Sequence, residues 1–331
     1  DVLVQRKVRF QSSIIPNGHR FAAMHAARTL SPEAALSEQW HGLPQLRLAA
    51  TVANNFESEY DVLRTNLEAF REWLVTRANL TVSFTGSSHL TQSAQDWVAD
   101  FMPVATARQP RENYSTARHD EEQTTPLREG LIAAADVAFC SCALSAPHVS
   151  NPDAPLVNVL SRLLAFDYLW EEIRVKGGAY GGMSVYDGSM RLFELMSYRD
   201  PYIKRTLDIY NGILGFVEKA HWSERDIERA VIGCAKAAER PIRPGPATAT
   251  AAWRYLTGLT EDIRQERRET LLAATPDSVK SAAVKLFREN YPRRNICVVS
   301  GRANLEKANT ELDDPLCLTP VSQHTAVAPR A

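Results

Sequence analysis

The segment from Leu169 to Gly182 combines polar side chains and glycines at a spacing that could place two reactive groups together. An amphipathic stretch runs through Arg174 and stops at a pair of glycines, after which Tyr180 precedes a second pair. Arg174 and Tyr180 are six residues apart, on either side of a break where glycines allow unusual backbone angles. The spacing therefore predicts two hydrogen-bonding side chains directed at one place.

A purely structural interpretation of this segment is equally open on spacing alone. In it, Gly177 would cap a helix in the left-handed conformation, Tyr180 would be a core aromatic, and Arg174 would be a surface charge near the helix C-terminus. A nucleotide-binding loop is disfavoured. Lys176 precedes the glycines, whereas the phosphate-binding motif GxxxxGK[ST] places its lysine after them, and the dinucleotide motif follows a strand and opens a helix.

The histidines do not form the pattern of a hydrolytic zinc site. Such a site has two histidines one helical turn apart beside a glutamate, as HExxH or HxxEH. His119 begins HxxEQ and His221 begins HxxER, so each lacks the second histidine. Both are predicted to be solvated surface residues, and we expect no metal ligands on this chain.

Composition places the chain among ordinary globular proteins of about two domains. It has 331 residues, of which 44% are apolar and 23% charged, with a formal net charge of −1. This balance gives no indication of a nucleic acid partner, and no apolar run approaches the roughly 18 residues that span a bilayer. The chain begins at Asp1 rather than methionine, which is compatible with a processed chain or a fragment, and a lost targeting segment stays open.

Five cysteines are present and none forms a CxxC pair, which favours buried free thiols in a reducing compartment over a zinc or redox site. Cys140 and Cys142 alternate in an apolar run, so both should face the same side of a strand.

Apolar periodicity, together with the proline, glycine and capping residues at the ends of segments, predicts a mixture of helices and strands. The expected strands are 2–14 (weakly), 79–86, 137–144, 183–186, 191–198 and 295–301. The expected helices are 21–30, one from Pro32, 57–77, 92–102, 156–175, one from Pro201 through 217, one opened by a capping box at Ser223, and 248–258, 261–273 and 276–290. The fold class predicted is α+β.

Two segments of the chain follow the same pattern, which is what a duplicated domain would leave. Phe70-Arg-Glu and Phe287-Arg-Glu each precede a basic turn, a strand and a glycine. The first copy is shorter, so we predict a partial α+β domain over 1–104, a polar linker over 105–130, a complete α+β domain over 131–312 and a loose tail over 313–331.

Five segments resemble the presequence protease branch of the pitrilysin-like zinc metallopeptidases, the inverzincins. They are Pro16-Asn-Gly-His-Arg-Phe-Ala22, Leu30-Ser-Pro32, Gly42-Leu-Pro-Gln-Leu-Arg47, Glu172-Ile-Arg-Val-Lys-Gly-Gly-Ala-Tyr-Gly-Gly182 and Ser197-Tyr-Arg-Asp-Pro201. The similarity runs in order through most of 14–300. Enzymes of this family consist of two halves, each of two similar α+β domains, which close around a peptide. The resemblance implies that this chain is the later part of the third domain together with the fourth, with a mainly antiparallel sheet.

The resemblance also implies which residues act and which are elsewhere. The family's zinc ligands and glutamate base lie on an HxxEH helix in an N-terminal half, in the same or a separate chain, so zinc belongs to the full enzyme. Arg174 and Tyr180 match the family's C-terminal contribution to the active site and are expected to be catalytic. Gly177, Gly178, Ala179 and Gly181 are expected to bind the substrate backbone.

The function predicted is therefore that of the C-terminal part of a zinc metalloendopeptidase. The full enzyme would degrade short unstructured peptides such as cleaved targeting sequences, and this chain alone would be inactive. The alternative is a non-catalytic scaffold or substrate-binding subunit of a pitrilysin-like assembly. The compartment stays open between the mitochondrial matrix, another organelle lumen and the bacterial cytoplasm.

Overall fold

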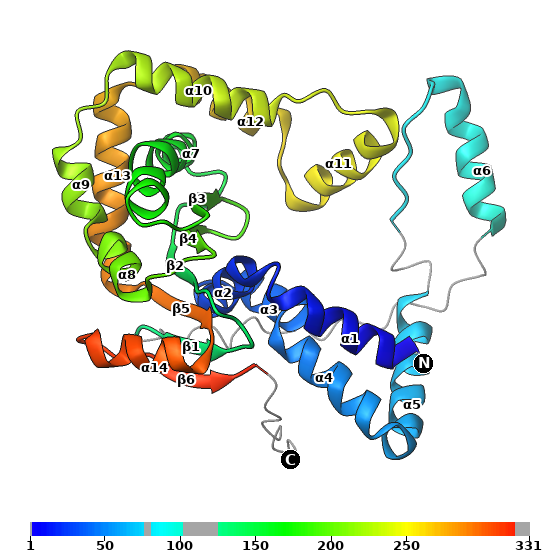
Figure 1. Ribbon diagram of the computed structural model, residues 1–331. Coiled ribbons are helices and arrows are strands. Elements are labelled where there is room, and N and C mark those ends of the chain that lie inside the picture. The colour runs from blue at the N-terminus through cyan, green and yellow to red at the C-terminus, as the bar shows by residue number, and fades with distance from the viewer. Residues whose placement is uncertain (1, 76–80, 102–124, 322–331) are drawn as a thin grey trace.

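The computed structural model describes residues 2–75, 81–101 and 125–321, and it is an α+β structure built on one mixed sheet (Figure 1). The N-terminal helices are α1 (Val2–Ile14), α2 (Gly18–Ala27), α3 (Pro32–His41), α4 (Leu43–Asn54), α5 (Phe56–Leu74) and α6 (Thr91–Phe101), with a short 3-10 turn η2 (Ser88–Leu90). The later helices are α7 (Ala154–Leu163), the π-helix η3 (Leu164–Val175), α8 (Ile203–Asn211), α9 (Ile213–Lys219), α10 (Glu224–Ala238), α11 (Pro244–Thr257), α12 (Glu261–Leu272), α13 (Pro276–Asn290), the 3-10 turn η4 (Tyr291–Arg293) and α14 (Arg302–Glu311).

The six strands form one sheet in the order β3-β4-β2-β5-β1-β6. They are β1 (Arg128–Ile132), β2 (Phe139–Ser145), β3 (Gly181–Asp187), β4 (Leu192–Tyr198), β5 (Asn295–Ser300) and β6 (Cys317–Pro320). The pairs β3–β4, β4–β2 and β2–β5 are antiparallel, whereas β1 is parallel to both β5 and β6. The sheet is thus mixed and mainly antiparallel, as the family resemblance implies.

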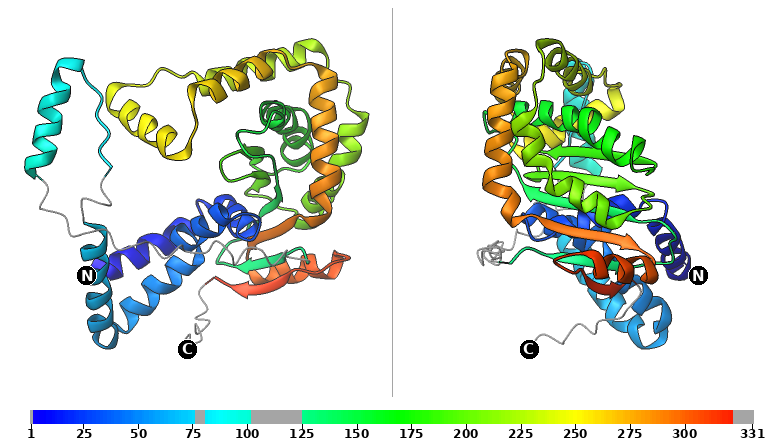
Figure 2. Two further views of the ribbon diagram at one scale, coloured as in Figure 1. Left: turned by 180° about the vertical axis from the view of Figure 1, so that it is seen from behind. Right: turned by 60° about the vertical axis from the view of Figure 1, so that its left-hand side comes forward.

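Alternation along the strands divides the core into two layers, one on each face of the sheet. On one face, Cys140, Cys142, Phe193 and Val298 pack with α7, η3 and α13. On the other, the intervening residues pack with α2 and its neighbours; they are Phe139, Ala143, Leu192, Cys297 and Val299. Figure 2 shows α13 and the N-terminal helices on opposite sides of the sheet. Cys140 and Cys142 share a face, as predicted.

Helix α2 joins the N-terminal region to the sheet. It lies against β2, β4 and β5, and its Phe21, Ala22 and Ala26 belong to the same core as the strands. A Cβ on Gly18 would lie 2.3 Å from the ring of Phe139, so the glycine permits this close approach. The predicted division at 104 therefore separates two regions that share a core in this structure.

The first segment corrects a prediction, because Val2–Ile14 is helix α1 and not a strand. The alternation of Val8 and Phe10 suggested period two. The less exposed positions of α1 instead recur at Leu3, Lys7, Phe10 and Ile14, which is the spacing of a helix face packed on α4.

Three further differences concern the predicted strand at 79–86, the linker and the tail. Residues 81–86 form no strand, and 79–80 lie outside the described residues. Strand β1 begins at Arg128, inside the predicted linker, whose residues 105–124 (with His119) lie outside the described residues. Strand β6 forms at Cys317–Pro320, within the predicted loose tail, because it pairs with β1.

All five cysteines are free thiols, with Cys140, Cys142, Cys234 and Cys297 buried and Cys317 exposed. Within the described ranges, no helix is both long and apolar enough to span a bilayer.

Candidate functional site

Arg174 lies in the last turn of the π-helix η3, which continues α7 without a break. π-Helices are rare and often occur at functional sites. The guanidinium carbon of Arg174 lies 4.1 Å from the ring centroid of Trp170 and 5.6 Å from that of Tyr180. The positive charge is thus held beside two aromatic rings, at the exposed end of the helix.

The glycines after η3 make the sharp exit of the chain possible. A Cβ on Gly177 would lie 2.3 Å from the carbonyl oxygen of Ile173, and Gly178 has a φ of +75° that disfavours other residues. The amide of Gly178 donates to the carbonyl of Arg174 at 3.0 Å, and that of Ala179 donates to Ile173 at 3.1 Å. This hydrogen bonding returns the chain to the sheet directly beside Arg174.

Tyr180 stands where the loop enters β3, with 64% of its surface exposed. Its amide donates to the carbonyl of Tyr198 at 3.0 Å, and its ring meets that of Tyr198 edge-on with centroids 5.7 Å apart. The backbone and ring of Tyr180 are therefore held, while its phenol has no hydrogen-bond partner among the described residues. A phenol in this position is free to donate to a ligand.

The loop is fastened from the side by Arg205 of α8, which donates to the carbonyl of Lys176 at 2.9 Å. Gly177, Gly178, Tyr202 and Arg205 line a shallow hollow of about 470 Å³ next to the loop.

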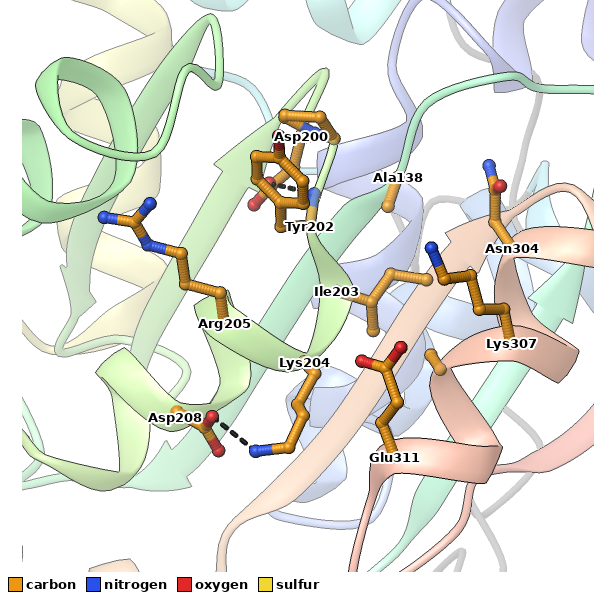
Figure 3. Close-up of a pocket in the computed structure, with 12 residues that line it drawn as sticks. Ala138, Asp200, Tyr202, Ile203, Lys204, Arg205, Asp208, Asn304, Lys307 and Glu311 are labelled. Carbon is orange, nitrogen blue, oxygen red and sulfur yellow. Dashed lines mark hydrogen bonds and ion pairs between the residues drawn. The ribbon is translucent and has the colours of Figure 1, made fainter.

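A second groove, of about 380 Å³, lies between α8 and α14 (Figure 3). There Lys204 pairs with Asp208, and Arg205 extends away from Lys307. It shares Tyr202 and Arg205 with the hollow beside the glycine loop, residues 176–182, but its lining includes neither Arg174 nor Tyr180.

The structure brings together the two side chains that were predicted to be catalytic, Arg174 and Tyr180, and both are exposed. The four predicted substrate-binding residues have different environments. Gly177 and Gly178 line the hollow, the side chain of Ala179 is buried in the core, and Gly181 pairs with Tyr198 in the sheet. Their roles in binding stay predictions.

Sequence reasoning did not single out Trp170, Tyr198 or Arg205. Trp170 precedes Arg174 by four residues, a spacing that could have indicated contact between neighbouring side chains of one helix. Tyr198 and Arg205 reach the loop only through the pairing of β3 with β4 and the packing of α8, which spacing does not reveal.

The residues of this chain do not provide a zinc site within the described ranges. No group of three or more His, Cys, Asp or Glu side chains there is placed to hold a metal ion. His221 is exposed, and His119 lies outside the described residues.

Comparison with known proteins connects this geometry to a family. Residues 148–301 match the family described as the PreP C-terminal domain, and residues 1–51 match the family described as associated with M16 peptidases of subfamily C. The glycine loop and Tyr180 fall inside the first match. The chain belongs to the presequence protease family. It carries the C-terminal part of these M16 peptidases.

Relatives in this family are similar over most of the chain. Presequence protease 1, chloroplastic/mitochondrial, of Arabidopsis thaliana is 26% identical over 311 residues, which cover 93% of this chain and 28% of that protein. The mitochondrial presequence protease of Gibberella zeae is 30% identical over 282 residues, covering 82% of this chain and 27% of that protein. The chain thus spans less than a third of the length of either relative.

Among solved structures, a peptidase M16 inactive domain from Pseudomonas fluorescens is 14% identical with a TM-score of 0.47, covering 69% of this chain and 53% of that one.

Proposed function

We propose that this chain supplies Arg174 and Tyr180 to the active site of a zinc metalloendopeptidase that degrades short unstructured peptides. The zinc ligands and the general base would lie on an N-terminal half that carries an HxxEH motif. The observation that carries the proposal is the meeting of an exposed guanidinium and an exposed phenol beside a glycine loop. Membership of the presequence protease family supports it.

The two side chains suit the chemistry of peptide hydrolysis. Attack on the scissile carbonyl places negative charge on its oxygen, and donors aimed at that oxygen stabilise the transition state more than the substrate. Tyr180 would donate its phenolic proton in a hydrogen bond, and Arg174 would add a fixed positive charge. The tight exit at Gly177 and Gly178 would let the peptide backbone approach both groups.

Kinetics of the enzyme reassembled with its N-terminal half test this proposal. Tyr180→Phe should lower kcat on the order of 10²–10³-fold, the usual cost of one oxyanion donor, with KM little changed. Tyr255→Phe is the matched control, because Tyr255 is 80% exposed on α11, a helix that does not contribute to the loop. A Tyr180→Phe enzyme with the wild-type rate would favour the alternative, a non-catalytic scaffold or substrate-binding subunit.

The chain alone is expected to be inactive, because the groups proposed here stabilise charge but do not activate water. Peptide hydrolysis by the purified 331-residue chain, abolished by a chelator, would contradict this division of roles. The control is the same preparation mixed with its N-terminal half, which should hydrolyse the peptide.

A further inference from the structure

A groove of about 580 Å³ lies between helices α2 and α3 and the strands β3 and β4. From the sheet, Leu192, Glu194 and Met196 of β4 point into it, since alternate residues of a strand share one face. From α2, the facing residues include Ala23 and Ala27. These methyl groups are too short to fill the space above β4, so the groove stays open.

Glu194 is a carboxylate in a largely apolar setting. It is half-buried, and no hydrogen bond or ion pair joins its side chain to any residue in the described part of the chain. Burial, with a smaller effect from Asp187, raises the pKa of Glu194 to about 7. A carboxylate that is partly shielded from water and has no partner is less stable when ionised, and a cation is the group that would offset this cost.

The charged groups around the groove do not provide that cation. Arg20 of α2 and His41 of α3 line it, but burial and Asp187 alone act on the pKa of Glu194. Asp187 of β3 adds a second carboxylate, whose Oδ1 accepts hydrogen bonds from Ser189 and Met190 in the hairpin turn. The Glu194 carboxylate therefore stays available to a ligand.

The walls leading to Glu194 are apolar and adaptable. Met24, Met190 and Met196 line the groove, and unbranched thioether side chains adjust to ligands of different shape. A long aliphatic stem that ends in a cation matches these walls and this charge together. Among protein side chains, lysine and arginine have this form.

We propose that this groove binds a lysine or arginine side chain of a peptide, with its stem on the methionines and its cationic group at Glu194. This peptide is the substrate of the peptidase proposed above, so the inference rests on that proposed function. In the β3–β4 pair, Glu194 lies opposite Val185, and Tyr198 lies opposite Gly181. The two pairs are four positions apart, a distance of about 13 Å along an extended strand. An extended peptide whose scissile bond lies at Tyr180 would thus place a basic residue about four positions away.

Calorimetric titration of the 331-residue chain tests this binding without any catalysis. The ligands are two acetylated, amidated unstructured peptides that are identical except for one central residue, lysine in one and the uncharged norleucine in the other. The lysine peptide should bind at least tenfold more tightly to the wild-type chain at pH 8. Equal affinities, or no binding of either peptide, would overturn the proposal.

Glu194→Gln isolates the charge. It should remove the advantage of the lysine peptide while leaving the affinity of the norleucine peptide unchanged. The variant should unfold cooperatively at pH 8, at a temperature no lower than that of the wild type, because it removes a half-buried carboxylate that has no partner, and this confirms that it folds. Glu228→Gln, on the exposed surface of α10, is the matched control and should keep the preference. A preference that survives in Glu194→Gln would refute the role of this carboxylate.

The pH dependence gives a further check. The lysine advantage should grow between pH 6 and 8 as Glu194 ionises. Asp187, Arg20 and His41 also face the groove. Because the proposal assigns the pH profile to Glu194, His41→Gln should leave this profile unchanged. Equal affinities of the wild-type chain for the two peptides, together with the expected loss of turnover in Tyr180→Phe, would refute the proposed groove alone and leave the proposed function standing.

Discussion

The ring of Tyr180 stands edge-on against the ring of Tyr198, with centroids 5.7 Å apart and planes inclined by 74°. Tyr198 is itself held by α2, since its ring lies 4.9 Å from that of His19 and its hydroxyl donates to the carbonyl of Pro16 at 3.4 Å. The N-terminal segment therefore supports the orientation of Tyr180 through one intervening ring. This gives a physical role to the Pro16–Arg20 segment, which is far from the glycine loop in sequence.

Removal of the Tyr198 ring should impair turnover without removing a reacting group. In the reassembled enzyme, Tyr198→Ala should lower kcat on the order of 10- to 100-fold, because Tyr180 loses the surface that fixes its ring. Tyr198→Phe keeps the ring and should retain most of the rate. If the two variants have equal kcat values, the ring contact does not position Tyr180.

The glycine loop should be sensitive at Gly178 because of its backbone angle. Gly178→Ala forces a left-handed alanine and should lower the free energy of unfolding by about 1–2 kcal/mol, measured by urea denaturation. It should also lower kcat in the reassembled enzyme, since the loop positions Tyr180.

Gly258 offers a matched control for this substitution. It has a φ of +68°, a Cβ at this position would meet no atom within 4 Å, and it follows α11 away from the loop. Gly258→Ala should therefore cost a similar free energy of unfolding and leave kcat unchanged. An equal loss of kcat in both variants would show that the effect arises from general destabilisation.

Elements whose ends are marked by capping or turn residues were predicted from the local sequence. The capping box of Ser223 with Asp226 opens α10 as expected, and the hairpin around Asp187 and Gly188 is present. The strand expected at 79–86 failed over its described residues, because β-branched and aromatic residues form a strand only beside a partner. Strand β1 was hidden in a polar segment, since parallel pairing with β5 and β6 decides its structure.

The candidate site was predictable to the extent that it is local. Arg174 and Tyr180 are neighbours along the chain, so a glycine break between them indicated convergence. Their support by Tyr198 depends on the register of β3 and β4, which brings Gly181 opposite Tyr198. Periodicity indicates that strands exist but does not determine which residues face each other across a pair.

The cysteines should differ sharply in reactivity. Burial raises the pKa of Cys142 to about 12 and that of Cys234 to about 11, so neither forms thiolate readily at pH 8. Cys317 is exposed. Titration with an aromatic disulfide reagent should label one thiol in the native chain and five in urea, and Cys317→Ser should abolish the native signal. Rapid native labelling of more than one thiol would contradict the buried positions.

A buried charged cluster attaches α2 and α3 to β1. His25 Nδ1 lies 2.7 Å from Glu38 Oε1, and Arg28 lies 2.6 Å from Glu129 Oε2. Burial lowers the pKa of His25, but hydrogen bonds to Glu129 and Glu38 outweigh it and raise the pKa above 6.5. Burial raises the pKa of Glu129, but hydrogen bonds to His25 and Arg28 bring it down to about 2.

Stability should therefore depend on pH through His25 in a definite direction. A histidine whose folded pKa is raised stabilises the protein fully below pH 6.5, and this contribution is lost as the pH rises through the folded pKa. Glu129 contributes above pH 4.5 and loses its contribution as the pH falls toward 2. His25→Gln should lower the free energy of unfolding by about 3–5 kcal/mol near pH 5.5, with a smaller deficit at pH 8.5. Urea denaturation at both pH values measures this, with the exposed His89→Gln as the control. A deficit that is equal at the two pH values would show that the charge on His25 does not stabilise the fold.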